Sequence, residues 1–452
     1  MHVKLGKILR VSLLGAVLAA ALCGSAFALT EGNFQYTLSN NEAHVTGLVE
    51  FTETVNVPDK LGGVPVVSID HDAMNRMFQS PKIVNVTLPD TVRMIGERAF
   101  HGCKNLRSIK MPASVEEIGL MAFEECESLT SIRLPDSVKT IGVQIFRDCS
   151  SLSDVRLPSQ LEEIPANAFS GCSSLRSISF PASVKVIGEC SFASSGLTSV
   201  TIPAGVTMEE SVFWNCASLA EVNLPAGLTK IPRGSFYGCT SLRSLYIPAS
   251  VTSIGSETFD KTALEELILP CNVKGLVFDA FSYCDNLKAI YAPSGAEVSM
   301  VPDNCIVYCT EGSKTEAQCK KHGDSYIIDP SVDSQIHVVY NGRRISFGAT
   351  GQNPVVESGR TLVPLRAIFE AMGATVGWDD ATKTVTATRG GDTIKLTLGD
   401  KTLYKNGKAV MTLDVPAKSL NGRTVVPARA VAEAFGADVG WIAAAKIVTI
   451  DE

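Results

Sequence analysis

A proline returns at a nearly constant interval through the first two thirds of the chain. Successive members of the series are 22 or 23 residues apart. A repeat this short cannot bury its own apolar face, so consecutive repeats must stack into a solenoid. Such a scaffold offers an extended surface instead of a single cleft, and we expect function on one of its faces. The ten prolines are Pro89, Pro112, Pro135, Pro158, Pro181, Pro203, Pro225, Pro248, Pro270 and Pro293.

Each repeat has two halves. The first alternates apolar residues, as in Leu106, Ile109 and Met111, which predicts a short parallel strand with its apolar side chains inward. The proline then ends the strand because it has no N–H to donate. The second half carries a phenylalanine at one phase, which predicts a stacked core column of Phe100, Phe123, Phe146, Phe169, Phe192, Phe213, Phe236, Phe259 and Phe281.

The cysteines follow the same period. Inward thiols about 4.8 Å apart along the stack have parallel Cα–Cβ bonds that disfavour disulfides, so we interpret this column as small buried apolar groups. Its members are Cys103, Cys126, Cys149, Cys172, Cys216, Cys239 and Cys284. Cys305, Cys309 and Cys319 lie outside the phase. We expect a Cys309–Cys319 disulfide that joins a closing helix to the last strand, and a zinc site is the alternative.

The frame Pro-x-x-Val-x-x-Ile-Gly-x-x-x-Phe-x-x-Cys-x-x-Leu resembles the BspA-like leucine-rich repeat of bacterial surface proteins. The resemblance spans about residues 31–329, with an opening cap over residues 33–73 and a closing cap that ends in a polar helix at His322. It implies a leucine-rich-repeat solenoid with a parallel β-sheet on one side and short helices or turns on the convex side. Two repeats depart from the frame, Pro181 to Pro203 and Pro248 to Pro270, and should deform the stack locally.

Residues 1–28 have the anatomy of a secretory signal peptide. Lys4, Lys7 and Arg10 precede an apolar run, and Ala26-Phe27-Ala28 provides a small-x-small cleavage site. We therefore expect a secreted protein that is extracellular or associated with the cell surface. Acylation of Cys23 is the alternative. No later stretch is long and apolar enough to span a bilayer, so the mature chain should have no transmembrane segment.

A second domain is expected over residues 336–452, after a polar linker at residues 330–335. Residues 359–374 return 63 residues later as residues 422–437, and both copies continue to a Gly-Trp pair at Trp378 and Trp441. Pro364 and Pro427 suit the first turn of a helix, and Gly373 and Gly436 suit its end. Each copy is predicted to be a short helix flanked by strands, which gives a small α+β domain built from a tandem duplication.

This tandem unit closely resembles the stalk domain named for the N-terminal part of copper amine oxidases. The resemblance implies a stalk or spacer, because the oxidases hold copper and their modified tyrosine in a separate catalytic domain. The Asn-Tyr-Asp and His-x-His motifs of that domain are missing here. We therefore expect no cofactor, no metal site and no amine oxidation.

Arginines recur in both copies of the duplicated segment. Arg366 with Glu370, and Arg429 with Glu433, are spaced as structural i, i+4 pairs on the two helices, and a ligand clamp is the alternative. Arg360 and Arg423 precede the helices. We interpret them as ties between the helix entrance and a neighbouring strand, with anion binding as the alternative.

The candidate binding site is the face of the solenoid's parallel sheet. In each strand the residue between the last two inward positions must point outward, and we call these residues the outward column. Its basic members are Lys110, Arg133 and Arg156, and its aromatic or apolar members are Tyr246, Ile268 and Tyr291. An ordinary solvated sheet face is the alternative, since exposed strands often carry Lys and Arg to suppress edge pairing.

Charge limits the choice of partner. The chain has a net charge of −7 and lacks the broad basic footprint that nucleic-acid binding needs, so no nucleic acid is expected. The stacked cations are a local exception and suit an acidic extracellular protein or glycan.

No catalytic residues are predicted. The carboxylates are dispersed over the repeats, no Ser or Cys has a histidine at a motif spacing, and no glycine-rich phosphate loop occurs. The favoured function is a non-enzymatic exported protein whose solenoid binds a protein or glycan partner, in adhesion or host interaction, with the C-terminal domain as stalk or spacer. The alternative is a structural envelope protein that binds the producer's own cell wall polymer or sister chains.

Overall fold

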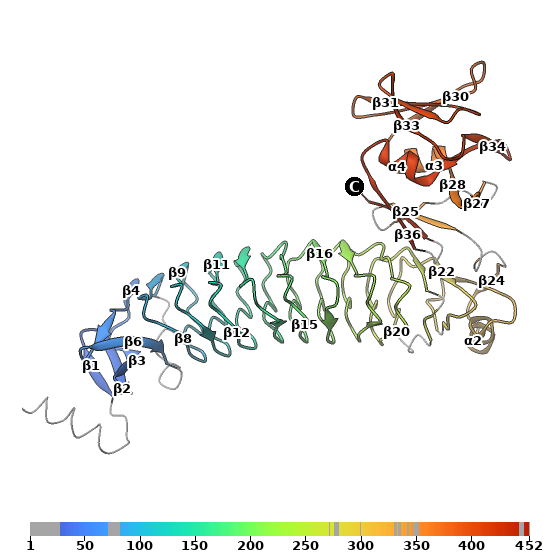
Figure 1. Ribbon diagram of the computed structural model, residues 1–452. Helices are drawn as coiled ribbons and strands as arrows, with labels where there is room; N and C mark the ends of the chain where they lie inside the picture. Colours follow the sequence, from blue (N-terminus) through green and yellow to red (C-terminus); the bar gives the residue numbers. More distant parts are fainter. Residues whose placement is uncertain are drawn as a thin grey trace, which may run out of the picture. The chain divides into compact units, whose positions relative to one another are not determined.

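A computed structural model gives the fold of the chain (Figure 1). It describes residues 28–70, 82–270, 272–274, 280–298, 300–329, 332, 336–340, 343–345, 347, 352–442 and 447–451. The expected signal peptide, except its last residue, and most of the expected linker lie outside these residues. The chain divides into two compact units. Unit 1 comprises the chain up to Pro225 with residues 231–241 and 257–262, and unit 2 comprises residues 226–230, 242–256 and 263 onward.

The solenoid opens with a hairpin. Strands β1 (Leu29–Glu31), β2 (Phe34–Ser39) and β3 (Glu42–Leu48) pair antiparallel, and β3 then pairs in parallel with β6 (Val64–Ile69). The short strand β5 (Lys60–Leu61) turns back onto β6 through Gly62 and Gly63, whose φ angles of 61° and 83° favour glycine. This segment starts the parallel stacking of the rungs, as expected for an opening cap.

Three-residue parallel strands form the first half of most rungs in unit 1. The members are in register, and a proline lies two residues beyond each strand of the repeat frame. The predicted short strands are thus confirmed. They are β4 (Thr54–Asn56), β7 (Asn85–Thr87), β9 (Ser108–Lys110), β11 (Ser131–Arg133), β13 (Asp154–Arg156), β16 (Ser199–Thr201) and β18 (Glu221–Asn223).

A second ladder of two-residue parallel strands was not predicted. It runs through the Ile-Gly part of the frame, where glycine lets successive rungs approach closely. A Cβ on Gly119 would lie 2.6 Å from the backbone nitrogen of Glu97, and one on Gly142 would lie 2.3 Å from the Gly119 carbonyl carbon. The strands are β8 (Met94–Ile95), β10 (Glu117–Ile118), β12 (Thr140–Ile141), β14 (Glu163–Ile164), β15 (Val186–Ile187), β17 (Thr207–Met208), β19 (Lys230–Ile231) and β20 (Ser253–Ile254).

Turns, not helices, complete the rungs in the described part of the chain before residue 313. The predicted phenylalanine column forms a continuous stack in the core. Successive rings from Phe100 to Phe259 have centroids 5.2–6.2 Å apart and interplanar angles of 6–23°. Every ring of this column is fully buried.

The cysteine column is buried beside the phenylalanines, and its seven cysteines form no disulfide. Most of them donate to the phenylalanine carbonyl of the previous rung, as Cys149 Sγ does to Phe123 O over 3.0 Å. Burial raises the pKa of the Cys216 thiol to about 11 and raises the pKa values of Cys126, Cys172 and Cys239 as well. These side chains behave as small apolar groups, as the sequence indicated.

The last rungs belong to unit 2. Strands β21 (Glu266–Ile268), β22 (Ala289–Ala292), β23 (Ile306–Cys309) and β24 (Tyr326–Ile328) form a parallel sheet. Helix α2 (Lys314–His322) lies between β23 and β24, as expected for a closing cap. Its N-terminus is capped because Ser313 Oγ accepts from the Glu316 N–H over 3.1 Å, while the Glu316 carboxylate accepts from the Gly312 N–H over 2.6 Å.

The expected Cys309–Cys319 disulfide is not formed. Both residues are free and buried. The Thr315 hydroxyl in the first turn of α2 donates to the Ala296 carbonyl over 3.0 Å. The cap is held by this contact and by the packing of α2 rather than by a covalent link.

The C-terminal domain is mostly β-structure with two short helices, α3 (Leu365–Ala371) and α4 (Ala428–Glu433). Three sheets surround the helices. The first contains β26 (Arg343–Arg344), β25 (His337–Tyr340), β37 (Ile447–Asp451) and β36 (Asp438–Ile442). The second contains β27 (Val355–Glu357), β28 (Arg360–Pro364), β35 (Arg423–Pro427) and β34 (Lys418–Leu420). The third contains β29 (Thr375–Asp379), β30 (Thr384–Arg389), β31 (Asp392–Thr397), β32 (Thr402–Lys405) and β33 (Lys408–Thr412).

The tandem duplication is visible in the packing of this domain. Strands β28 and β35 pair antiparallel with Val363 opposite Val426, so equivalent residues of the two copies face each other. The helices meet through Phe369 and Phe435, whose rings are 5.1 Å apart and edge to face. Gly373 and Gly436 follow the helices with φ angles of 80° and 92°, as predicted for helix ends. Pro364 and Pro427 lie just before the first helical residue instead of inside the first turn.

Candidate functional site

The basic part of the outward column lies on the sheet of unit 1. Lys110, Arg133 and Arg156 are the last residues of β9, β11 and β13, and all three are exposed. Arg133 and Arg156 stand opposite each other in the parallel register. The sequence therefore placed these three side chains on the predicted face.

Two aspartates that sequence reasoning missed share this face. Arg133 pairs with Asp154 over 3.2 Å, and Arg156 pairs with Asp136 over 3.1 Å. The arginines are thus part of a mixed network, whereas we expected a column of bare cations. Lys110, on the preceding rung, has no ion pair among the described residues, so this part of the column keeps an excess of one positive charge.

Asp136 is held in its charged form. The Ser159 backbone N–H and hydroxyl, followed by the Arg156 guanidinium, lower the pKa of its carboxyl. In the sequence, Asp136 could have been noticed because it directly follows Pro135. Asp154 could have been noticed because it begins a strand at the position where the neighbouring repeats carry Ser108 and Ser131. All four members of the two ion pairs remain at least half exposed, with exposed side-chain fractions of 50–69%.

The regular strand pattern is interrupted next to the short repeat. Residues 177–179 form no strand, although they occupy the place of β11 and β13 in their own rung. Here a hollow of about 490 Å³ opens, and Phe180 is among the residues that line it. Its polar lining consists of Ser177, Ser179, Ser199, Thr201, Glu221 and Asn223. These residues precede Pro181, and residues 244–246 of a regular repeat also form no strand, so the interruption does not test the deformation expected for the Pro181 to Pro203 repeat.

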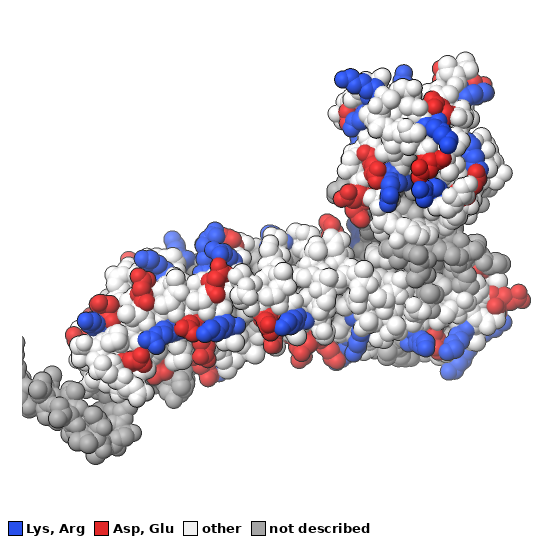
Figure 2. All heavy atoms as spheres, viewed as in Figure 1, with Lys and Arg blue, Asp and Glu red and all other residues white. Residues whose placement is uncertain are grey.

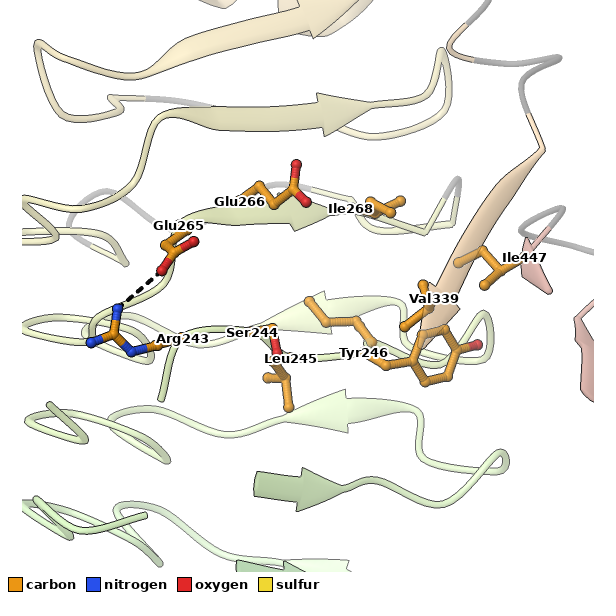
Figure 3. A pocket seen from close by; sticks show the side chains of 10 residues that line it. Arg243, Ser244, Leu245, Tyr246, Glu265, Glu266, Ile268, Val339 and Ile447 are labelled. Atoms are coloured by element: carbon orange, nitrogen blue, oxygen red, sulfur yellow. Dashed lines mark hydrogen bonds and ion pairs between the residues drawn. The ribbon is translucent and has the colours of Figure 1, made fainter. Parts of the chain in front are cut away.

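The apolar part of the outward column lies in unit 2. Tyr246 and Ile268 come from successive rungs, beside the Arg243–Glu265 ion pair of 3.1 Å (Figure 3). Tyr246, Ile268 and Tyr291 are all partly buried. They are therefore less accessible than the basic members of the column.

Sequence reasoning missed two residues that extend this part of the column. In the register of β21 to β24, Ile268 stands opposite Tyr291, Tyr291 opposite Tyr308 and Tyr308 opposite Ile327. The rings of Tyr291 and Tyr308 are stacked 4.9 Å apart. Tyr308 and Ile327 lie beyond the proline frame, and their only signal was the alternating pattern of the closing cap.

Other charges along unit 1 pair between rungs. Glu116 binds Lys139 over 2.6 Å, and Glu162 binds Lys185 over 2.7 Å. On the face drawn in Figure 2, basic and acidic side chains are interleaved over the first rungs of this unit. Exposed pairs of this kind contribute roughly 0–1 kcal/mol each, so they favour solubility and register more than stability.

One carboxylate of unit 1 is buried. Glu124 is 6% exposed and lies 3.4 Å from both His101 Nε2 and Arg147 Nη1. Burial raises the pKa of Glu124, while His101 and Arg147 act in the opposite direction. Its position at the edge of the core makes it a structural group that responds to pH.

The arginines of the C-terminal domain behave differently in the two copies. Arg429 pairs with Glu433 over 3.5 Å, and Arg360 pairs with Asp414 over 2.5 Å. The expected Arg366–Glu370 pair is not formed, because neither side chain has an ion pair among the residues that the structure describes. Arg360 is thus tied to a bend between β33 and β34 and not to a neighbouring strand, and Arg423 has no ion pair among the described residues.

The described residues contain no cluster of His, Cys, Asp and Glu suited to a metal ion. Within the same residues, no helix combines the length and the apolar character that crossing a bilayer requires.

Family models match both parts of the chain. The model described as "BspA type Leucine rich repeat region" matches residues 73–198 and 185–313 in six copies. The model described as "Copper amine oxidase N-terminal domain" matches residues 339–450. No curated protein matches the chain.

Solved structures of bacterial repeat proteins are similar to the solenoid. A leucine-rich repeat protein from Bacteroides ovatus is 25% identical, with a TM-score of 0.40 and coverage of 67% of this chain and 99% of that one. A leucine-rich cell surface protein from Faecalibacterium prausnitzii is 25% identical, with a TM-score of 0.35 and coverage of 59% and 94%. The pneumococcal vaccine antigen PcpA is 19% identical, with a TM-score of 0.45 and coverage of 67% and 99%.

The two matches of the repeat model together cover residues 73–313. The prolines, phenylalanines and cysteines recur at the same period within this region. This region is more than half of the sequence. The chain therefore belongs to the BspA-type leucine-rich repeat family.

Proposed function

We propose that this chain is a non-enzymatic protein of the bacterial exterior whose solenoid binds an extracellular protein or glycan. Membership in a family of cell-surface repeat proteins supports the location. The outward column supports the mode of binding, because in each unit it presents long polar or aromatic side chains on successive rungs. The C-terminal domain acts as a stalk or spacer, in keeping with its match to a non-catalytic domain.

The observation that carries the proposal is the exposed network of Lys110, Arg133, Asp154, Arg156 and Asp136. An acidic partner meets an unpaired ammonium at Lys110 and two guanidiniums that are held in place by single carboxylates. Guanidiniums bind carboxylates and phosphates through paired N–H donors. A partner that brings several acidic groups can replace or share the aspartate contacts, and its affinity should fall as salt increases.

The tyrosines of unit 2 would supply the apolar part of an interface. Stacked tyrosines such as Tyr291 and Tyr308 present a broad amphipathic surface with little entropy left to lose. Tyrosine is also enriched among the residues that contribute most to binding. Tyr246 and Ile268 add to this surface within the same unit.

A pull-down tests the proposal. The protein without residues 1–28 is presented to host matrix proteins, glycans and fragments of the producer's cell wall. An Arg133→Glu/Arg156→Glu variant should lose the captured partner. A Lys139→Glu/Lys185→Glu variant changes the same number of charges on the other ladder and should keep it.

Equal capture by both double variants would contradict the proposed face. Capture of only the producer's wall fragments or of sister chains would favour the structural envelope function instead. That outcome keeps the binding face and changes the partner.

A further inference from the structure

The C-terminal domain has two equivalent hollows that arise from its duplication. The Trp378 hollow, of about 280 Å³, is lined by Trp378 of β29, Arg366 of α3, and Arg423 and Thr424 of β35. The Trp441 hollow, of about 510 Å³, is lined by Trp441 of β36, Arg429 of α4, and Arg360 and Thr361 of β28. Each residue of one set is thus the duplicate of a residue in the other.

Each hollow combines parts of both copies. The helix and the tryptophan strand come from one copy, and the Gly-Arg-Thr segment comes from the other. The exchange follows from the antiparallel pairing of β28 with β35, which brings the start of each strand to the helix of the opposite copy. A hollow is therefore complete only in the folded tandem domain.

An exposed tryptophan marks both hollows. Trp378 is 40% exposed and Trp441 is 46% exposed, although indole rings favour burial. Trp378 Nε1 donates to Asp380 Oδ1 over 3.4 Å, and Asp380 is neutralised by Lys383 at 2.7 Å. The indole of Trp378 is thus anchored at its polar edge while much of the ring stays open to solvent.

The two hollows differ in charge. In the Trp441 hollow, both guanidiniums are paired with carboxylates that also line it, Arg360 with Asp414 and Arg429 with Glu433. In the Trp378 hollow, Arg366 and Arg423 have no ion pair within the described part of the domain, and no carboxylate is part of the lining. Only the Trp378 hollow therefore offers two free cations beside an open indole.

We propose that the Trp378 hollow binds a sugar unit that carries a carboxylate, as part of an acidic glycan. A pyranose ring has an apolar C–H face and a polar edge. The indole of Trp378 would stack on the apolar face, and Thr424 and Ser419 would donate hydrogen bonds to hydroxyls. Arg366 and Arg423 would pair with the carboxylate.

The shape of the hollow favours a sugar over a peptide side chain. The space is small for a ligand pocket, which is roughly 300–1,000 Å³, and it has one flat aromatic wall beside polar groups. Apolar residues also line the hollow, but two guanidiniums and two hydroxyls share it, which suits a sugar with an apolar face and a polar edge better than a purely apolar peptide anchor.

The first test is a titration of the full mature chain with an oligouronate, followed by calorimetry and by tryptophan fluorescence. In the Arg133→Glu/Arg156→Glu background, which removes the acidic-partner face proposed for the solenoid, we expect one site per chain and a change in fluorescence. The same oligosaccharide with its carboxyl groups reduced to alcohols should bind at least about tenfold more weakly, since it lacks the charged contacts. Equal binding of the acidic and reduced sugars would overturn the proposal.

Matched variants locate the site. Trp378→Ala and Arg366→Gln/Arg423→Gln should each weaken binding about tenfold or more, whereas Trp441→Ala and Arg429→Gln should leave it unchanged. Trp378→Phe keeps a stacking ring and should retain most of the affinity, which separates loss of contact from loss of folding. Unchanged binding in the folded Trp378→Ala variant, or equal losses in both hollows, would contradict the assignment.

A converse variant tests the role of the free cations. Asp414→Asn/Glu433→Gln releases Arg360 and Arg429 in the Trp441 hollow, so the number of bound sugars should rise from one to two. A stoichiometry that stays at one would refute free guanidiniums as the determinant of the site. These measurements do not depend on the solenoid face, because Arg133→Glu/Arg156→Glu should leave oligouronate binding intact.

Discussion

At the scale of single residues, the ionisation of Glu124 should make the stability of the solenoid depend on pH. Burial raises its pKa, and His101 and Arg147 oppose the shift. The folded state therefore holds the proton more tightly than the unfolded state does. The stability that the protonated form contributes is present below the ordinary glutamate pKa of roughly 4.3 and is lost as the pH rises through the higher folded value.

Replacing this carboxyl tests the shift. Glu124→Gln should be more stable relative to wild type at pH about 7 than at pH about 4, because wild type alone has to ionise a buried group as the pH rises. Thermal unfolding of both proteins over this range measures the difference. Parallel stability curves would show that Glu124 titrates as an ordinary surface carboxylate.

A second residue-scale prediction concerns the phenylalanine column. Phe146→Ala should lower the free energy of unfolding by roughly 3–5 kcal/mol, because the cavity that it leaves is shared with the rings of both neighbouring rungs. Val143 lies in the same rung and is 41% exposed, so Val143→Ala is the matched control and should cost far less. Denaturant unfolding of the two variants gives the comparison, and similar losses would contradict the core assignment.

The sequence predicted these core positions because they recur at one phase. It did not predict the partners of the arginines on the outward column. Arg133 and Asp154 are 21 residues apart, and Arg156 and Asp136 are 20 apart, whereas neighbouring rungs in this region repeat after 23. Such pairs run diagonally between rungs and depend on side-chain rotamers, which a repeat frame does not specify.

At the scale of elements, the three-residue strands followed from alternation and from the prolines that end them. The second ladder was missed because two residues are too few for a periodic signal. Its position was nevertheless marked by the Ile-Gly pair of the frame, since Gly119 and Gly142 are required where backbones of adjacent rungs meet. The closing helix α2 was predicted, whereas the disulfide expected at its side was not found.

The cysteine column gives a prediction at this scale. Burial raises the pKa values of its thiols, so Cys126, Cys172 and Cys239 should resist alkylation in the native protein. After denaturation without a reductant, all seven thiols of the column should be labelled, as mass spectrometry would show. Finding most of them joined in disulfides would refute the buried column.

At the scale of the whole molecule, the chain joins a repeat solenoid to a domain whose name suggests redox chemistry. The resemblance of residues 339–450 is to a domain that is separate from the catalytic domain of the oxidases. Accordingly, the purified protein should contain no stoichiometric copper by elemental analysis and should release no peroxide from amines. Bound copper or peroxide release would require a site that the repeats and the tandem domain do not explain.

The sequence indicated both folds of the molecule because both are built from repeats, which amplify weak local signals. It could not indicate the two hollows of the C-terminal domain. Each hollow joins residues from different copies, such as Trp378 with Arg423, and depends on how β28 and β35 pair. The same holds for the extension of the outward column to Tyr308, which needs the register of the last strands.

The central claim is that the outward column is a binding face, and binding kinetics test it most directly. The partner from the pull-down is immobilised, and association and dissociation are measured at low and high salt. Arg133→Glu/Arg156→Glu should slow association and invert its salt dependence, because the reversed charges repel an acidic partner and salt screens that repulsion. Tyr246→Ala should speed dissociation at either salt concentration, because it removes an apolar contact. Wild-type kinetics for both variants under both conditions would show that the face is only a solvated sheet.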